Sequence, residues 1–297
     1  GDFGNMGASI PVGQLGADYE VAGNYVRFKK VYRGANYDES MRGPLADPGV
    51  NVKDGDYLLE IDGQAINANT NPNSLLMNKV GKVVTIKVND RPSETGARTY
   101  RVRPVGNEGQ LRYTDFVEGN RKWVEKMSGG RIGYMHIPNT AAEGSREFVR
   151  GYWSQTDKDA VIVDERWNGG GYIQPWFVDT LARKIKAGIQ VRNSKEDGSD
   201  SVAIEGPKAM LINGYAGSGG DFFPWMFRHE KVGPLIGSRT CGGLVGISGG
   251  APLLDGGSVT APEFSIFDRD TQEIIAENQG IAPDIEVTTG HCRRGVR

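Results

Sequence analysis

Two apolar runs in the second half of the sequence are each followed by a glycine-rich loop and then by a segment with helical periodicity. The first run is VIVD at 161–164, followed by ERWNGGGY, and the second is AMLIN at 209–213, followed by GYAGSGGD. A repeated succession of strand, loop and helix predicts an α/β domain with a largely parallel sheet. Because the carboxyl ends of parallel strands lie at one edge of the sheet, we expect both glycine loops at that edge, where α/β proteins bind ligands.

Ser218 stands in the second loop, directly before a predicted helix. A serine at a strand-to-helix turn exposes its hydroxyl and lies in the partial positive field of the helix N-terminus. The amide of Gly219, together with the amide of Gly171 or its neighbour Gly170 from the first loop, can face the same space and hold an oxyanion. This combination suits acyl transfer with Ser218 as the nucleophile.

Each loop taken alone has a simpler interpretation as a tight turn, in which Ser218 is an N-cap and Asp221 charges the first turn of the helix. Phosphate binding is a third interpretation, but neither loop carries a Gly-Lys-Ser/Thr sequence or a lysine at its tip. Asp164 and Arg166 flank the first loop and are expected to pair with each other. Two such loops after successive strands favour the nucleophile.

The first hundred residues follow a different pattern. Short β-rich runs at 19–32, 56–66, 83–89 and 97–105 alternate with turn residues, and one weak helical segment runs from Asn73 to Lys79. This predicts a small β-rich unit with a helix, in which Asp62-Gly63 forms a two-residue hairpin turn.

Residues 44–63, PLADPGVNVKDGDYLLEIDG, resemble the middle of a PDZ domain. The resemblance implies that an extended peptide adds as a strand to the sheet while backbone amides hold its terminal carboxylate. The loop with Leu15, Gly16 and Ala17 is the expected carboxylate cradle. The alternative is a unit that packs against a neighbour and binds no peptide.

We expect five segments in the chain of 297 residues, which is long enough for about two domains. Residues 1–15 end an upstream β-rich domain, 16–106 form the PDZ domain, 107–130 form a linking helix and 131–290 form the α/β catalytic domain. Residues 291–297 depart from the preceding pattern and are expected to be a non-native tail. Because the chain opens on GDFGNMGASIP without an initiator methionine, we expect a fragment of a longer protein.

Four strings follow one another in the second half of the chain: VIVDERWNGGG, MLINGYAGSGGD, GSRTCGGLVGI and ENQGIAPDIEV. With the PDZ-like unit ahead of them, they resemble the tricorn protease family, whose catalytic domain has a crotonase- or ClpP-like α/β fold. The resemblance implies a serine peptidase that trims oligopeptides as a homo-oligomer, a hexamer. It makes Ser218 the nucleophile, Gly219 with Gly171 or Gly170 the oxyanion donors, and Glu277 the acid of a charge-relay tetrad.

The general base is the point at which the sequence departs from the family. C-terminal processing peptidases, which share the PDZ domain and the sheet, use a lysine where this sequence has Gly243, so a Ser-Lys dyad is disfavoured. In the tricorn family the base is a histidine in a β-rich domain ahead of the PDZ domain, a segment not in this sequence. The fragment is therefore expected to turn over poorly, and Glu277 then has a structural role instead.

The three histidines of this chain are weak substitutes for that base. His136 ends a predicted strand and is the first candidate, although a polar residue that closes a strand is the simpler interpretation. His229 lies about three turns, roughly 16 Å, along the helix that follows Ser218, which is too far for proton transfer. His291 belongs to the tail, to which we assign no role.

The composition of the chain argues against several classes of binding partner. The chain has 35 basic and 37 acidic residues and a net charge of −2, which disfavours nucleic acid. Its apolar runs are far shorter than the roughly 18 residues of a membrane span, and Cys241, Cys292 and the histidines form no disulfide or zinc pattern. We therefore expect peptide substrates and no metal, cofactor, nucleic acid or membrane.

Two competing functions and the compartment stay open at this point. The first alternative is a non-catalytic, PDZ-type peptide-binding module on a crotonase-like scaffold. An acyl-CoA enzyme on the same sheet is a weaker alternative, because a PDZ-like unit indicates peptide chemistry. The cysteine usage permits a cytoplasmic location, which we expect, with the periplasm as the alternative.

Overall fold

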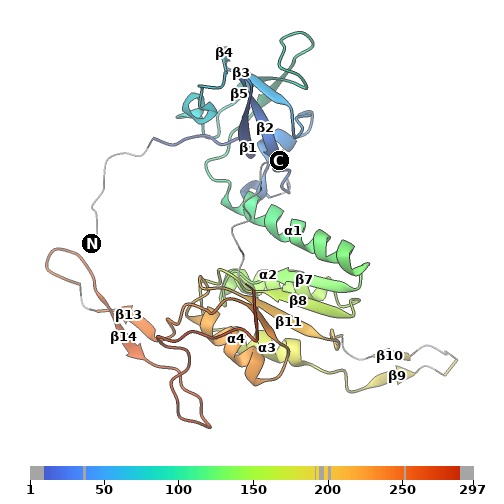
Figure 1. Ribbon diagram of the computed structural model, residues 1–297, viewed down its shortest axis with the longest axis vertical. Helices are drawn as coiled ribbons and strands as arrows, with labels where there is room; N and C mark the ends of the chain where they lie inside the picture. Colours follow the sequence, from blue (N-terminus) through green and yellow to red (C-terminus); the bar gives the residue numbers. More distant parts are fainter. Residues whose placement is uncertain are drawn as a thin grey trace. The chain divides into compact units, whose positions relative to one another are not determined.

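The chain folds into two compact units, Gly1–Gly119 and Asn120–Arg297. The computed structural model describes residues 10–35, 38–190, 192–193, 197–199, 202–250 and 252–287. The division between the units falls within helix α1 (Gly109–Ser128), which the sequence predicts as the linking helix (Figure 1). The expected tail at 291–297, with His291, lies outside the described residues. None of the described helices combines the length and the apolar character needed to cross a membrane.

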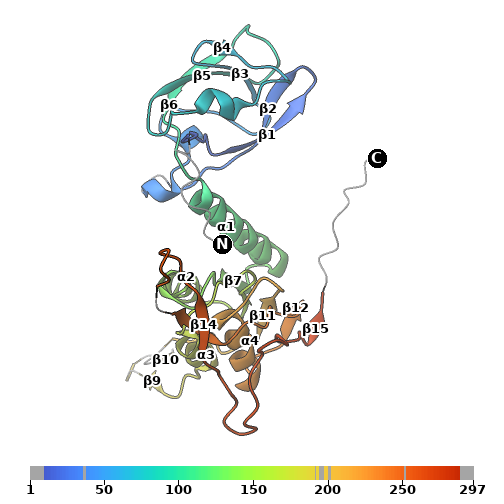
Figure 2. The ribbon, with the colours of Figure 1, turned by 90° about the vertical axis from the view of Figure 1, so that its left-hand side faces the viewer.

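The first unit is built on one antiparallel sheet with the strand order β1-β2-β3-β5-β6, with β4 paired to β3 (Figure 2). Its strands are β1 (Ala17–Ala22), β2 (Tyr25–Val31), β3 (Tyr57–Ile61), β4 (Gln64–Ala65), β5 (Val84–Asn89) and β6 (Arg98–Val102). Three short 3-10 helices connect them: η1 (Glu39–Met41), η2 (Pro44–Ala46) and η3 (Pro72–Leu76). The predicted helical segment at Asn73 is therefore the 3-10 helix η3, with Pro72 in its first turn.

Local sequence explains this unit well. Alternate side chains of β5, namely Val84, Ile86 and Val88, are buried, as a half-buried strand requires. Asp62 and Gly63 both have positive φ, 47° and 79°, which is the backbone of a tight hairpin turn between β3 and β4. The predicted β-rich PDZ-like unit is thus confirmed.

The second unit contains a five-stranded sheet in the order β15-β12-β11-β8-β7, and every neighbouring pair is parallel. The strands are β7 (Ile132–His136), β8 (Ala160–Asp164), β11 (Lys208–Ile212), β12 (Leu235–Gly237) and β15 (Ile285–Glu286). The helices are α2 (Ala142–Trp153), α3 (Gln174–Ala182) and α4 (Gly219–His229). Two small hairpins, β9 (Gly188–Gln190) with β10 (Asp197–Ser199) and β13 (Gly246–Gly249) with β14 (Thr260–Phe264), complete the unit. The predicted parallel α/β domain is confirmed.

Three buried phenylalanines join the helices of this unit. Phe148 of α2 stacks on Phe177 of α3 with 4.6 Å between ring centroids, and Phe177 meets Phe223 of α4 at 5.5 Å. All three side chains are buried in the same core as the apolar side chains of β8 and β11. Since α4 begins at the second glycine loop, this packing fixes the helix that presents Ser218.

We expect Phe177→Ala to lower the free energy of unfolding of the second unit by about 3–5 kcal/mol, because a buried ring is lost and a cavity remains. Urea denaturation followed by circular dichroism measures the change. Trp123→Ala is the control, since that ring is 63% exposed and its removal leaves no cavity. Equal losses for the two variants would contradict this account of the core.

Candidate active site

Ser218 has a strained backbone at the start of α4. Its φ of 56° and ψ of −118° lie in a region that residues other than glycine rarely adopt. Ser218 is the N-cap residue of α4, but its side chain makes no capping hydrogen bond, so the expectation that it satisfies the helix amides is wrong. In the described part of the chain the Ser218 hydroxyl has no hydrogen-bond partner, while its amide donates to Gly243 O at 3.0 Å. The hydroxyl is therefore held out from the helix and left available.

The two glycine loops converge on this serine. A Cβ built on Gly170 would lie 2.8 Å from Ser218 Cβ and 3.0 Å from Ser218 Oγ. A Cβ on Gly219 would overlap the Thr140 hydroxyl and would lie 2.7 Å from Gly171 N. Only glycine fits at such close approaches, so the sequence-predicted residues Gly170, Gly171, Ser218 and Gly219 lie together.

The amides of these loops differ in what they bind. The Gly170 amide donates to Asn168 Oδ1 at 2.9 Å, and the Gly169 amide donates to Pro138 O at 2.9 Å. The amides of Gly171 and Gly219 donate to no residue that the structure describes. Two backbone donors of the loops around Ser218 thus have no hydrogen-bond partner in the described part of the chain.

Asn168 connects the two loops and was not singled out from the sequence. Its side chain is fully buried, donates to Ile137 O at 3.2 Å and accepts from the Gly170 amide. Its main-chain oxygen accepts from the Gly217 amide at 3.1 Å. The only sequence signal is an asparagine ahead of three glycines at a strand end, which also fits an ordinary turn.

Asp221 lies in the first turn of α4, as the sequence predicts, and its carboxylate also binds the neighbouring loop. It is fully buried, and it accepts from Thr240 Oγ1 at 2.5 Å and from the amides of Gly242 and Gly243 at 2.8 and 3.0 Å. Three donors satisfy a carboxylate that burial would otherwise destabilise. Asp221 therefore fastens α4 to the loop whose Gly243 carbonyl binds the Ser218 amide.

Glu277 binds the next two residues of the same loop. Its Oε2 atom accepts from the amides of Leu244 and Val245 at 2.7 and 2.8 Å. Its other oxygen, Oε1, makes no hydrogen bond within the described residues, and the side chain is half-buried. The structure thus places Glu277 in the loop network of Ser218, and its role as a relay acid stays a prediction.

The two described histidines are held by other contacts. His136 is buried at the end of β7, and its Nε2 lies 2.9 Å from Arg166 O. Burial lowers the pKa of His136, which favours the neutral ring. The His229 ring stacks on Trp225 with 4.6 Å between centroids. Neither ring is hydrogen-bonded to Ser218.

Two acidic residues at the end of β8 have opposite environments. Asp164 accepts from Arg166 Nε and Nη2 at 2.8 and 2.6 Å, so the predicted pair is confirmed. The neighbouring Glu165 is fully buried, and neither of its carboxyl oxygens has a hydrogen-bond partner in the described part of the chain. Burial, and then the charges of Asp164 and Asp221, raise the pKa of Glu165 well above its ordinary value, so the acid is held in its neutral form.

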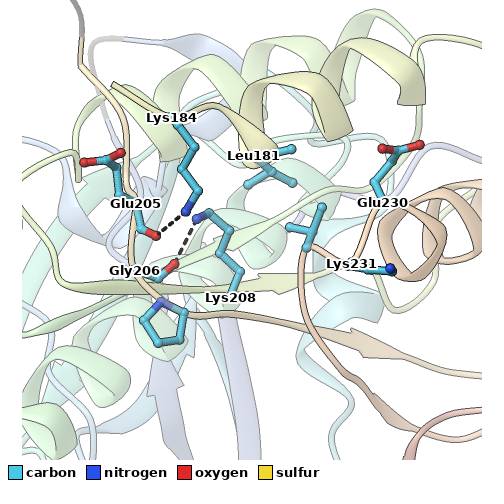
Figure 3. A pocket seen from close by; sticks show the side chains of 10 residues that line it. Leu181, Lys184, Glu205, Gly206, Lys208, Glu230 and Lys231 are labelled. Carbon is cyan, nitrogen blue, oxygen red and sulfur yellow. Dashed lines mark hydrogen bonds between the residues drawn. The ribbon is translucent and has the colours of Figure 1, made fainter. Parts of the chain in front are cut away.

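A cavity of ≈ 450 Å³, whose lining includes Lys184, Glu205 and Lys208, is shown in Figure 3. It lies at the amino end of β11, and Ser218 follows the opposite end of that strand. Lys208 Nζ donates to Gly206 O at 2.9 Å, and Lys184 Nζ donates to Glu205 O at 3.2 Å. Burial and the nearby charge of Lys184 lower the pKa of Lys208. Because β11 separates this cavity from the glycine loops, the cavity is not part of the Ser218 site.

The expected peptide cradle of the first unit is already occupied by the chain. Leu15 and Ala17 are buried, with 1% and 5% of their surface exposed. The Gly16 amide donates to Glu108 Oε1 at 2.8 Å. Peptide capture by these residues stays a prediction.

A strained serine at a strand-to-helix turn, with two open backbone amides beside it, is the arrangement of a serine hydrolase. Residues 131–287 match the model of peptidase family S41, and residues 13–107 match that of the tricorn protease PDZ domain. The chain therefore belongs to peptidase family S41, and its PDZ domain is of the tricorn protease type.

Similar proteins agree with this placement. The chain is 32% identical over 276 residues to tricorn protease of Thermoplasma acidophilum, covering 93% of this chain and 25% of the relative. It is 35% identical over 282 residues to a tricorn protease homolog of Saccharolobus solfataricus, covering 94% and 26%. A crystal structure of tricorn protease superposes with a TM-score of 0.83 at 30% identity, covering 94% of this chain and 27% of that one. The chain spans 23–32% of the length of the curated relatives it matches.

We expect Asp221→Asn to lower the free energy of unfolding by roughly 2–4 kcal/mol, because hydrogen bonds to a charged group contribute about 1.5–3 kcal/mol each and the new NH₂ group faces an amide donor. Hydrogen exchange at Gly242 and Gly243 is expected to accelerate in parallel. Asp255→Asn is the matched control, since Asp255 is exposed and accepts from one local amide. Unchanged exchange at Gly242 and Gly243 would show that Asp221 does not hold the loop.

Glu165 makes stability depend on pH. The folded state keeps a proton that the unfolded chain releases above the ordinary carboxyl pKa of 4.5, so the free energy of unfolding falls as pH rises from there towards the raised pKa. The slope is at most about 1.4 kcal/mol per pH unit. Glu165→Gln has no such proton, so its stability relative to wild type is expected to rise with pH. Urea denaturation from about pH 5 to about pH 8 measures the difference, and parallel profiles would contradict a protonated Glu165.

Proposed function

We propose that Ser218 is the nucleophile of a serine peptidase and that the amides of Gly219 and Gly171 bind the oxyanion of its tetrahedral intermediate. The observation that carries the proposal is the pairing of an available serine hydroxyl with two amides that have no partner in the described part of the chain. Membership of peptidase family S41 supports it. Gly171 is chosen over Gly170 because the Gly170 amide is engaged by Asn168.

The reaction proposed for this site is hydrolysis of a peptide bond in two steps. Ser218 Oγ attacks the carbonyl carbon, and the carbonyl oxygen gains the negative charge that the two amides stabilise. The carbon–nitrogen bond then breaks, the amine leaves with a proton, and an ester to Ser218 remains until water hydrolyses it. Donors fixed in the folded backbone need no reorganisation when this charge appears, which is why rigid glycine loops suit the task.

A serine hydroxyl needs a base to take its proton, and we place that base outside the described residues. No described side chain is hydrogen-bonded to Ser218 Oγ, and His136 is committed to Arg166 O. Glu277 Oε1 is open, so Glu277 is the acid proposed to orient the base from the loop network around Ser218. Oligopeptides are the proposed substrates, and a homo-oligomer is the proposed assembly.

We expect a fluorophosphonate probe to label Ser218, because such probes are attacked by an activated serine and place an oxygen in the oxyanion site. Mass spectrometry of the 297-residue chain, and of a longer protein that contains it, identifies the labelled residue. Ser218→Ala is expected to abolish labelling, while Ser74→Ala in the other unit leaves it unchanged. Labelling only in the longer protein would place the base beyond this chain.

The opposite result has an equally definite meaning. If neither protein is labelled at Ser218, the nucleophile proposal is wrong, and the non-catalytic peptide-binding function takes its place. Circular dichroism of each variant separates a loss of the nucleophile from a loss of the fold.

A further inference from the structure

A buried carboxylate binds the loop of Leu15, Gly16 and Ala17, which the sequence predicts to be a carboxylate cradle. Glu108 has only 6% of its surface exposed, and its Oε1 accepts from the Gly16 amide at 2.8 Å across 92 residues of sequence. Gly16 has a φ of 74°, and a Cβ there would approach Leu111 and Pro44 to 3.0 and 3.2 Å. The turn that presents this amide is thus shaped for glycine and closed around the carboxylate.

Arg112 binds the second carboxylate oxygen of Glu108. Its Nε donates to Glu108 Oε2 at 2.6 Å, and its Nη1 donates to Asp18 Oδ1 at 2.7 Å. The guanidinium also lies over the Tyr32 ring, 4.4 Å from the centroid. A carboxylate with an amide on one oxygen and an arginine on the other is fully paired, which is what allows it to be buried.

A cavity lies beside an edge strand at this point. A cavity of ≈ 320 Å³ is lined by residues of β1, by Asn73 of η3 and by Glu108 and Arg112. β1 is an edge strand of its sheet, the position at which an extended peptide adds to a PDZ domain. The Tyr19 hydroxyl at this cavity is buried and has no hydrogen-bond partner in the described part of the chain. A cavity is therefore present beside the edge strand, while the Gly16 amide of the expected cradle is already engaged by Glu108.

We propose that Glu108 stands in for the terminal carboxylate of a peptide, so that this unit excludes free carboxyl termini for as long as Glu108 remains on the Gly16 amide. A second carboxylate entering the cradle would meet the negative charges of Glu108 and Asp18 and would find the amide already engaged. Removing the Glu108 carboxyl group leaves the Gly16 amide and Arg112 as a vacant site for a carboxylate ligand. This inference does not depend on the chemistry at Ser218.

Acetate is the probe for the vacant site, because it is a carboxylate small enough to replace the side chain that was removed. The Gly16 amide resonance of the full chain is followed by NMR during titration with sodium acetate, against sodium chloride at equal ionic strength. In Glu108→Ala we expect a saturable shift and an affinity for acetate at least about tenfold higher than in wild type, together with a rise in melting temperature that chloride does not give. An acetylated trialanine with a free carboxylate is expected to produce the same shift, and its amide is not.

Two further variants keep the test decisive. Glu108→Ser removes the carboxylate and places a favoured N-cap residue directly before α1, so it serves if the alanine variant does not fold. Glu94→Ala removes a carboxylate with 71% exposure in the same unit and is expected to leave Gly16 unresponsive. An acetate-induced shift of Gly16 in wild type equal to that in Glu108→Ala would overturn the proposal, and so would the absence of any shift in both Glu108 variants.

Discussion

The buried carboxylate of Asp221 is the point on which the arrangement of the Ser218 site depends. It lies in the first turn of α4 and binds Thr240, Gly242 and Gly243 together. The adjacent carbonyl of Gly243 accepts from the Ser218 amide, so the strained serine is held from both the helix and the loop. A backbone conformation that costs on the order of 1–3 kcal/mol persists only when its surroundings determine it in this way.

Two other carboxylates of the chain also accept hydrogen bonds from backbone amides of loops. Glu277 binds the amides of Leu244 and Val245, and Glu108 binds the Gly16 amide. In each case a side-chain carboxylate satisfies backbone donors of an irregular loop that has no sheet or helix partner. Glu165 is the exception, because it is buried without donors and is therefore neutral. The contrast is in the donors: the other three carboxylates have hydrogen-bond partners, and Glu165 has none in the described part of the chain.

The amides of Gly171 and Gly219 take no part in this network and have no hydrogen-bond partner in the described part of the chain. Asn168 engages the Gly170 amide and the Gly217 amide, which ties the two glycine loops to each other. The loops can then hold unpaired donors in place without collapsing onto them. The phenylalanine packing of α2, α3 and α4 stabilises the unit that holds these unsatisfied groups.

Local pattern by itself determined the order of a β-rich unit and a parallel α/β unit, the Asp62-Gly63 turn and the position of Ser218 between β11 and α4. Those features depend on residues close together in sequence, namely periodicity, turn residues and glycine strings. Only the tertiary structure decided which amide each carboxylate binds, that Asn168 joins the two loops, and that Glu165 is neutral. The reason is that these contacts join segments tens of residues apart, such as Gly16 and Glu108, whose approach is set by strand register and helix packing rather than by any local pattern.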